Sequence, residues 1–345
     1  QTINKEKFMK RTISTMLAAA SILTLGTFSA NADRLTILVG YGAGGTYGQT
    51  SLLLARHLKE FAPGNPTVVV QHMPGAGGSK ATNYAYNAMP KNGAFVLMPP
   101  EMIVVSQLLR PKKMKFKANK FTWLGRVFGA NQVMSIRSDT GFKTIAELQK
   151  NEVIVASTGK GSPTFLVPTM MNGILGTKFK IVAGYKGSKR TSMSVEQGET
   201  KGMSNSWVSW KKNRRDWFLG CGTKCFMVKL TQVGYVKEPD LPNLPLLTDL
   251  AQSADDKAAA AMLSTAAVIG RGLAYPPGVS SSKIKSMRKG FWNTVNSATF
   301  RADAKSKRLP VTPIKGAEIQ KIVNNALKMS PEAVNKARKH VFPNK

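Results

Sequence analysis

The sequence predicts an α/β fold with two lobes, each a mostly parallel sheet flanked by helices. Two observations support this prediction. Short apolar runs alternate with helical patterns along the chain, and the same order of elements restarts after a basic linker at residues 112–120. Alternation of strands and helices is typical of parallel sheets that helices cover on both faces. No internal repeat of about 20–50 residues is evident.

The first half of the predicted fold lies between residues 35 and 98. Short apolar runs predict strands, and amphipathic stretches that end near glycine or proline predict helices. The expected strands are Leu35–Val39, Thr67–Gln71 and Ala94–Met98, and the expected helices are Gln49–Ala62 and Ser79–Met89.

The second half repeats this pattern and leads into a helical C-terminal third. Strands are expected at residues 151–158 and 179–185, and helices at 162–175 and 187–197, the first with Ser162 as N-cap and Pro163 after it. The apolar run Ala266–Gly270 is grouped with the strands and precedes helices from Ser280 to Val341. The chain is expected to cross between lobes near residues 133–136 and again near residues 266–273.

The first 32 residues have the features of a secretory signal peptide. Met9-Lys10-Arg11 is a basic start, Met16–Gly26 is apolar, and Ala30-Asn31-Ala32 is a cleavage site. The apolar run is too short for a membrane anchor, which needs about 20 residues. We therefore expect export, with residues 1–8 lying upstream of the leader.

The chain is strongly basic, with a formal net charge of +32. Such a charge is compatible with nucleic acid, an anionic membrane, acidic ligands or simply a basic surface. The clusters Lys112–Lys117 and Lys211–Arg215 lack the stacked-aromatic or helix-in-groove motifs of a specific nucleic-acid site. A solvated face is the preferred interpretation, and no specific nucleic acid is expected.

Cys221 and Cys225 are the two cysteines of the chain, separated by three residues. In an oxidising compartment a close pair is expected to form a small disulfide loop, and Gly222 helps the chain to turn back. The alternative is a redox motif, but its usual C-x-x-C spacing is one residue shorter.

Glycine turns follow three of the predicted strands. Gly40, Gly42 and Gly45 form G-x-G-x-x-G, but the second strand ends in Gln71-His72, without the acid that a dinucleotide site requires. A second turn contains Gly75, Gly77 and Gly78, and a third lies between residues 157 and 162. Turns that open helices at strand ends present main-chain amides and attract anions. The pattern therefore favours an anion clamp between the lobes, with no cofactor.

The titratable residues suggest no catalytic or metal centre. The three histidines, His57, His72 and His340, have neither metal-ligand spacing nor the pattern of a triad. Glu101 and Glu147 are interpreted as helix-start residues. We therefore expect neither an enzyme nor a metal site.

Several of these segments resemble the periplasmic solute-binding proteins of the tripartite tricarboxylate transporters, the Bug receptors. The resemblance covers about residues 35–341. Its most specific segments are VGYGAGG at residues 39–45, NPTVVVQHMPGAGGSKATNY at 65–84, STGKGSP at 157–163, PDLPNLPLLTDL at 239–250 and YPPGVS at 275–280. The chain departs from the family at Gly48, where an acid is usual.

The resemblance implies a type II-like periplasmic binding protein fold with a ligand cleft between the lobes. The first lobe would comprise residues 33–135 and 268–345, and the second residues 136–267. In the family, main-chain amides of the first two glycine loops and ordered water hold the carboxylate of an organic acid. Carried onto this chain, the ligand-binding residues are Tyr41, Gly42, Ala43, Gly44, Gly45, Thr46, Gly75, Ala76, Gly77, Gly78, Thr158, Gly159, Ser162, Thr164, Gly187, Ser188, Asn205, Ser206 and Trp207.

The function implied is that of a periplasmic receptor, expected to be a monomer. It would deliver its acid to the large and small membrane subunits of the transporter. Two alternatives remain open at this point. One is a cationic secreted protein that binds surfaces or nucleic acid, and the other is an α/β enzyme that acts on an acid.

Overall fold

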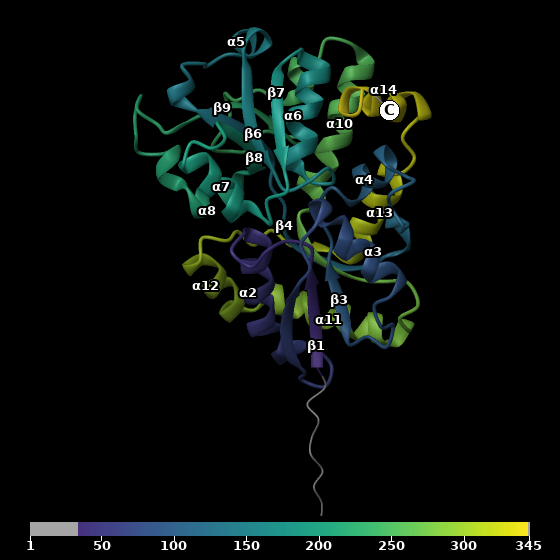
Figure 1. Cartoon of the computed structure of the whole chain (residues 1–345). Helices are drawn as coiled ribbons and strands as arrows, with labels where there is room; N and C mark the ends of the chain where they lie inside the picture. Colours follow the sequence, from purple (N-terminus) through teal and green to yellow (C-terminus); the bar gives the residue numbers. More distant parts are fainter. Residues whose placement is uncertain (1–33, 344–345) are drawn as a thin grey trace, which may run out of the picture. The chain divides into compact units, whose positions relative to one another are not determined.

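Two mixed β-sheets form the framework of residues 34–343, which the computed structural model of this chain describes (Figure 1). The predicted signal peptide at residues 1–32 lies outside the described residues. In the described part of the chain, no helix is both long enough and apolar enough to cross a membrane.

The first sheet has the strand order β11-β4-β10-β3-β1-β2. β1 pairs in parallel with β2 and with β3, whereas β10 is antiparallel to β3 and β4, and β11 is antiparallel to β4. The strands are β1 (Arg34–Val39), β2 (Thr67–His72), β3 (Phe95–Met98), β4 (Thr122–Phe128), β10 (Arg271–Tyr275) and β11 (Ile314–Lys315).

The second sheet has the order β7-β6-β8-β5-β9. β6 pairs in parallel with β7 and β8, and β5 is antiparallel to both of its neighbours. Its strands are β5 (Gln132–Arg137), β6 (Glu152–Ser157), β7 (Lys178–Ala183), β8 (Gly202–Ser206) and β9 (Met227–Val233). The parallel strands of both sheets thus arise from the strand–helix alternation that the sequence shows.

Helices cover both sheets. In Figure 1, α2, α11 and α12 lie beside the first sheet, and α5, α6, α7 and α8 lie around the second. The helices are α2 (Thr46–Phe61), α3 (Ser79–Asn87), α4 (Ile103–Leu109), α5 (Ile145–Lys150), α6 (Pro163–Leu175), α7 (Ser188–Glu196), α8 (Trp207–Asn213), α9 (Leu247–Leu250), α10 (Ala254–Ile269), α11 (Ser281–Asn296), α12 (Ala298–Ser306), α13 (Gly316–Ala326) and α14 (Pro331–Val341). Short 3₁₀ turns are η1 (Ala76–Gly78), η2 (Ala118–Lys120), η3 (Ser138–Thr140) and η4 (Arg215–Trp217).

The central strands of each sheet are buried on both faces, as expected for strands between two helical layers, whereas the edge strands β2 and β7 are partly exposed. In β1, Ile37 and Val39 pack in the core beneath α2 and α11, whereas Leu38 packs on the opposite face with residues near α3 and α13. The second sheet likewise separates two apolar clusters, one of which contains Trp207 and Trp210. α14 packs against α6 and α10.

The chain passes from the first sheet to the second at residues 129–131 and returns at Gly270. These two crossings touch through their backbones, because a Cβ at Gly270 would lie 2.0 Å from the carbonyl oxygen of Phe128. A Cβ at Gly129 would lie 2.2 Å from the carbonyl oxygen of Ala267. Only glycine fits at either crossing.

One predicted element is wrong. Residues 266–269, grouped with the strands, are the last turn of α10, and the strand of this region is β10, which begins at Arg271. The alanine-rich segment before them favours a helix, and Ser253 caps its start by accepting a hydrogen bond from the amide of Asp256. Gly270, with φ of 56°, ends the helix and lets the chain turn into the first sheet.

Candidate functional site

A cavity of about 40 Å³ lies where elements of both sheets meet. Its walls come from the loops that follow the carboxyl ends of β1, β3 and β6, from the end of β8, and from the first residues of β5 and β10. Ligands of open α/β sheets bind at this edge. The lining residues are Tyr41, Gly45, Thr46, Tyr47, Glu101, Gln132, Thr158, Ser162, Pro163, Thr164, Ser188, Ser204, Asn205, Ser209 and Arg271.

Three helices begin at the cavity wall. α2 starts at Thr46, α6 at Pro163 and α7 at Ser188, and each of these residues lines the cavity. A helix N-terminus carries roughly half a positive charge, together with amides that have no partner within the helix. Three such ends around one small space make it attractive to an anion.

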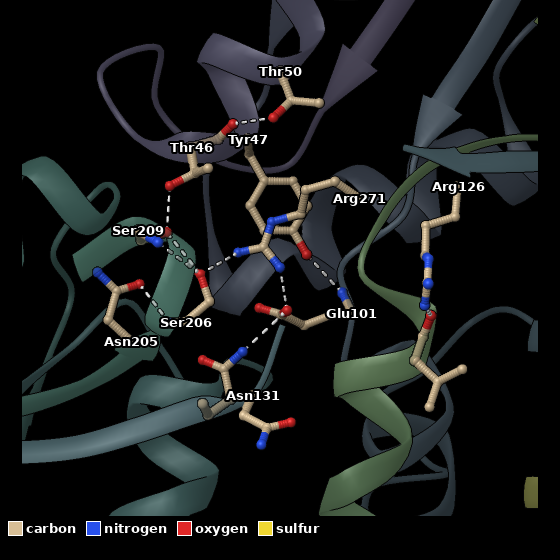
Figure 2. Close-up of polar contacts among 12 residues, drawn as sticks. Thr46, Tyr47, Thr50, Glu101, Arg126, Asn131, Asn205, Ser206, Ser209 and Arg271 are labelled. Carbon is tan, nitrogen blue, oxygen red and sulfur yellow. Dashed lines mark hydrogen bonds and ion pairs between the residues drawn. The ribbon is translucent and has the colours of Figure 1, made fainter. Parts of the chain in front are cut away.

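Hydroxyl groups make up much of the wall. Thr164 Oγ1 lies 2.6 Å from Ser162 Oγ and accepts a hydrogen bond of 2.9 Å from the amide of Thr158. On another side, the hydroxyls of Thr46 and Ser209 are in contact, joining α2 to α8 across the two sheets (Figure 2). Such hydroxyls donate or accept, so they can adapt to the polar groups of a ligand.

A buried ion pair forms another part of the wall. Arg271 Nη1 contacts Glu101 Oε2, and each side chain is 3% exposed. Gln132 Nε2 donates to the same carboxylate at 3.1 Å. Arg271 Nη2 donates to Ser206 Oγ at 3.2 Å (Figure 2). The guanidinium carbon lies 4.3 Å from the centre of the Tyr47 ring, within the range of a cation–π contact.

Burial governs the titration of this region. It raises the pKa of the Glu101 carboxyl, and the neighbouring Arg271 offsets part of that shift. It also raises the pKa values of the Tyr41 and Tyr47 phenols well above their usual range, so both stay protonated. Tyr41 uses its proton to donate to the carbonyl oxygen of Gly77 at 2.9 Å, and Tyr47 Oη accepts from the amide of Glu101 at 2.7 Å.

The glycine turns face one another across the two sheets. The amide of Gly42 donates to the carbonyl oxygen of Lys186 at 2.9 Å. A Cβ at Gly77 would lie 2.5 Å from the amide nitrogen of Ser162, and one at Gly159 would lie 2.8 Å from that of Gly77. This close approach explains why glycine occupies these positions. At Gly48, where the resembled family has an acid, a Cβ would lie 2.2 Å from the carbonyl oxygen of Ala43, so the turn accepts no side chain there.

The structure brings eight of the expected ligand-binding residues to the cavity wall and leaves eleven away from it. Those at the wall are Tyr41, Gly45, Thr46, Thr158, Ser162, Thr164, Ser188 and Asn205. Those that do not line it are Gly42, Ala43, Gly44, Gly75, Ala76, Gly77, Gly78, Gly159, Gly187, Ser206 and Trp207. Ser206 contacts Arg271 from behind the wall, whereas the fully buried Trp207 packs on Phe218 and donates to Asp240 Oδ1 at 2.9 Å.

Seven lining residues were not predicted. Tyr47 and Pro163 adjoin predicted positions, so the helix starts at Thr46 and Ser162 already point to them. Glu101, Gln132, Ser204, Ser209 and Arg271 are brought in by the fold. The interpretation of Glu101 as a helix-start residue is wrong, because its carboxylate pairs with Arg271 instead of an amide of α4. Glu147 does form a capping box with Thr144 at the start of α5.

The other candidate residues lie apart from this cavity. His57 contacts Asp303 at 3.0 Å, His340 contacts Asp256 at 2.6 Å, and His72 Nδ1 lies 2.8 Å from the carbonyl oxygen of Tyr41. Among residues 34–343, no three His, Cys, Asp or Glu side chains gather into a metal-ligand set. Cys221 and Cys225 are joined in a disulfide, with the two Cα atoms 4.9 Å apart.

Comparison with solved structures identifies the architecture. The chain superposes on the periplasmic binding protein BugD with a TM-score of 0.70 and 17% identity, covering 89% of this chain and 97% of BugD. It superposes on MatC from Rhodopseudomonas palustris with bound malate at 0.68 and 14% identity, covering 89% and 98% of the two chains. For R. palustris Rpa4515 with adipate the values are 0.67 and 15%, with 88% and 97% covered.

These likenesses confirm the expected two-lobed periplasmic binding protein fold. At this level of identity they show the fold alone. No protein-family model and no curated protein matches the sequence.

Proposed function

We propose that this protein is a periplasmic receptor that captures a small organic acid. The observation that carries the proposal is the cavity, which lies at the carboxyl ends of parallel strands and faces three helix N-termini. The solved structures of the same fold support it, because they include a protein with bound malate and another with adipate.

In the proposed mechanism, capture depends on main-chain amides and hydroxyls. An acid enters between the lobes, and main-chain amides replace its water. They are those at the start of α2 and α7 and, in α6, that of Thr164, because Pro163 has no N–H. The turn at Gly75–Gly78 supports the first glycine turn from behind, through the hydrogen bond from Tyr41 to the carbonyl oxygen of Gly77. The closed state is the one in which the glycine turns of the two sheets touch.

The sequence predicted lobes of residues 33–135 with 268–345, and of residues 136–267. Because β5 (Gln132–Arg137) belongs to the second sheet and α10 runs to Ile269, we propose boundaries at residues 129–131 and at Gly270 instead. Hinge motion at the two backbone crossings, Gly129 and Gly270, would open and close them. The closed receptor then docks on the large and small membrane subunits of a tripartite tricarboxylate-type transporter. The signal peptide at residues 1–32 would direct the protein to the periplasm, where it acts as a monomer and not as an enzyme.

A thermal-shift screen against carboxylic acids, followed by titration calorimetry, tests this proposal. Any ligand that binds the folded state alone raises the melting temperature. Thr46→Val should weaken the binding of the best acid about fivefold to tenfold, because it removes one hydrogen-bonding hydroxyl at the wall. Thr294→Val is the matched control, since Thr294 is equally buried but lies in α11, away from the cavity.

The outcome also separates the two alternatives. A cationic surface-binding protein would bind DNA or lipid with an affinity that falls steeply with salt, and no acid would raise its melting temperature. Two cations of the cluster Lys211–Arg215 already form ion pairs, because Lys211 pairs with Asp240 at 2.8 Å and Arg214 pairs with Glu196 at 2.9 Å. An enzyme would convert the bound acid during the titration.

A further inference from the structure

The charged side chains of the cavity wall belong to one buried ion pair. Among the described residues that line the cavity, Arg271 is the only cationic side chain and Glu101 the only anionic one. They come from different parts of the first sheet, Arg271 from the start of β10 and Glu101 from the loop after β3. Burying two charges is costly unless each finds good partners, so a buried pair at a ligand cavity calls for an explanation.

The partners of Arg271 leave one edge of its guanidinium group incompletely used. Nη1 contacts Glu101, and Nη2 donates one hydrogen bond, to Ser206 Oγ at 3.2 Å. Within residues 34–343, Arg271 Nε has no hydrogen-bond partner, although Arg271 is 2% exposed. The hydroxyl of Ser204, also buried and at the cavity wall, is likewise without a partner in this part of the chain.

Unused buried donors at a cavity indicate what the cavity binds. A buried donor without an acceptor loses the hydrogen bonds that it made to water. Nε and one Nη of an arginine form a parallel pair of donors that matches the two oxygens of a carboxylate. Figure 2 shows the guanidinium between Glu101 on one side and the hydroxyls of Ser206 and Ser209 on the other. A carboxylate at this edge would therefore also lie near hydroxyls.

The volume of the cavity limits the rest of the ligand. The cavity is small, at about 40 Å³, so it suits a small ligand with a short chain better than a long one. The hydroxyls of Thr46, Ser204 and Thr164 at the wall suit a ligand that carries a hydroxyl of its own.

We infer that Arg271 is a specificity-determining residue that binds the carboxylate of a short-chain hydroxy monocarboxylic acid. This inference rests on the proposed receptor function and names the substrate class of the same cavity. Glu101 and Gln132 hold the guanidinium in place. The Glu101 carboxylate also disfavours a second negative group on the ligand, because like charges repel strongly in a site without water.

Calorimetric titration of the full chain with lactate and with lactamide tests the inference. The two probes have the same shape, but only lactate is charged, so the ratio of their affinities measures recognition of the carboxylate. In Arg271→Gln this ratio should fall about tenfold or more, the usual effect of losing a hydrogen bond to a charged group. Arg271→Lys keeps the charge but loses the paired donors, and should give an intermediate ratio.

Arg126→Gln is the matched control. Arg126 is also buried and also has an Nε without a partner among the described residues, but it lies in β4 and donates to the carbonyl oxygens of Val268 and Thr312. It does not line the cavity. We expect Arg126→Gln to lower the melting temperature and to leave the lactate-to-lactamide ratio unchanged. A purely structural role of Arg271 would give the same result for both arginines.

A second variant addresses Glu101. Glu101→Gln should raise the affinity for the diacid malonate relative to lactate about fivefold or more, because it removes the repelling charge and keeps the shape. An unchanged ratio in Arg271→Gln, or binding of malate or adipate more tightly than lactate by the wild type, overturns the inference and leaves the receptor function standing. If the wild type binds no acid, the receptor function itself fails, and this inference with it.

Discussion

Gly77→Ala is the perturbation that the geometry defines most sharply. Gly77 lies in the turn after β2 and approaches the loop before α6, so it joins elements of the two sheets. Gly141 provides a matched control. Both glycines have left-handed backbones, with φ of 67° and 78°, but a Cβ at Gly141 would meet nothing within 4 Å.

The structure sets the size of the two effects. A left-handed alanine costs roughly 1–2 kcal/mol, so each variant should lose about that much unfolding free energy. At Gly77 the new Cβ would also lie 2.5 Å from the amide nitrogen of Ser162, whereas ordinary contacts begin at 3.4 Å. The turns must therefore separate by about 0.9 Å, and overpacking of this kind costs about 1–3 kcal/mol. Because closure brings these turns together, the extra cost should appear in ligand affinity, as a loss of about fivefold to 150-fold.

Urea unfolding and calorimetric titration of the best-binding acid provide the two measurements. We expect both variants to lose similar unfolding free energy, and Gly77→Ala alone to lose affinity. Equal affinity of Gly77→Ala and Gly141→Ala would refute the idea that the contact between the turns belongs to the ligand-binding state.

Three further predictions concern residues outside the cavity. Hydrogen bonds from Lys307 and His57 lower the pKa of Asp303 to about 2. The stabilising effect of this carboxylate is therefore present above about pH 4 and is lost as the pH falls through 2. Asp303→Asn should lower the melting temperature at pH 7, and the difference from wild type should shrink below about pH 4 and vanish only below about pH 2. Replacing Cys221 and Cys225 by serine should lower the unfolding free energy by up to about 2 kcal/mol, because the loop that the disulfide closes is short. The affinity for the acid should stay unchanged. A tenfold loss of affinity would contradict the placement of this loop away from the cavity. Trp207→Phe removes the hydrogen bond to Asp240. It should lower the unfolding free energy, measured with urea, by about 1 kcal/mol and leave the affinity for the acid unchanged. A large loss of affinity would instead place Trp207 in the ligand cleft.

The elements that the sequence predicted are those whose local pattern agrees with their final environment. β1, β2 and β3 are short apolar runs, and α2 and α6 begin directly after Gly45 and Ser162, so periodicity and turn residues locate them. β8 was not predicted, because GMSNS has almost no strand propensity. Its polar residues Ser204 and Asn205 line the cavity. The same polar side chains that suit the site therefore remove the apolar pattern by which a strand is predicted.

Some residues of the candidate site could likewise be predicted from the sequence, and others could not. Residues next to the glycine turns, such as Thr46 and Thr164, could be predicted because turns at the ends of parallel strands gather at one edge of a sheet. Arg271 and Glu101 are 170 residues apart in the sequence, and only the pairing of β10 with β3 brings their segments together. No local pattern distinguishes this pair from the many surface charges of a basic chain.

A crystal structure of the protein with the acid that raises its melting temperature most would locate the ligand. We predict density for the acid in the cavity between the two sheets, within hydrogen-bond distance of Thr46 and Ser204 and of the amides at the start of α2. We also predict that its carboxylate lies against Arg271. An acid bound elsewhere at full occupancy, with this cavity holding only water, would contradict the proposal that the protein captures its ligand here.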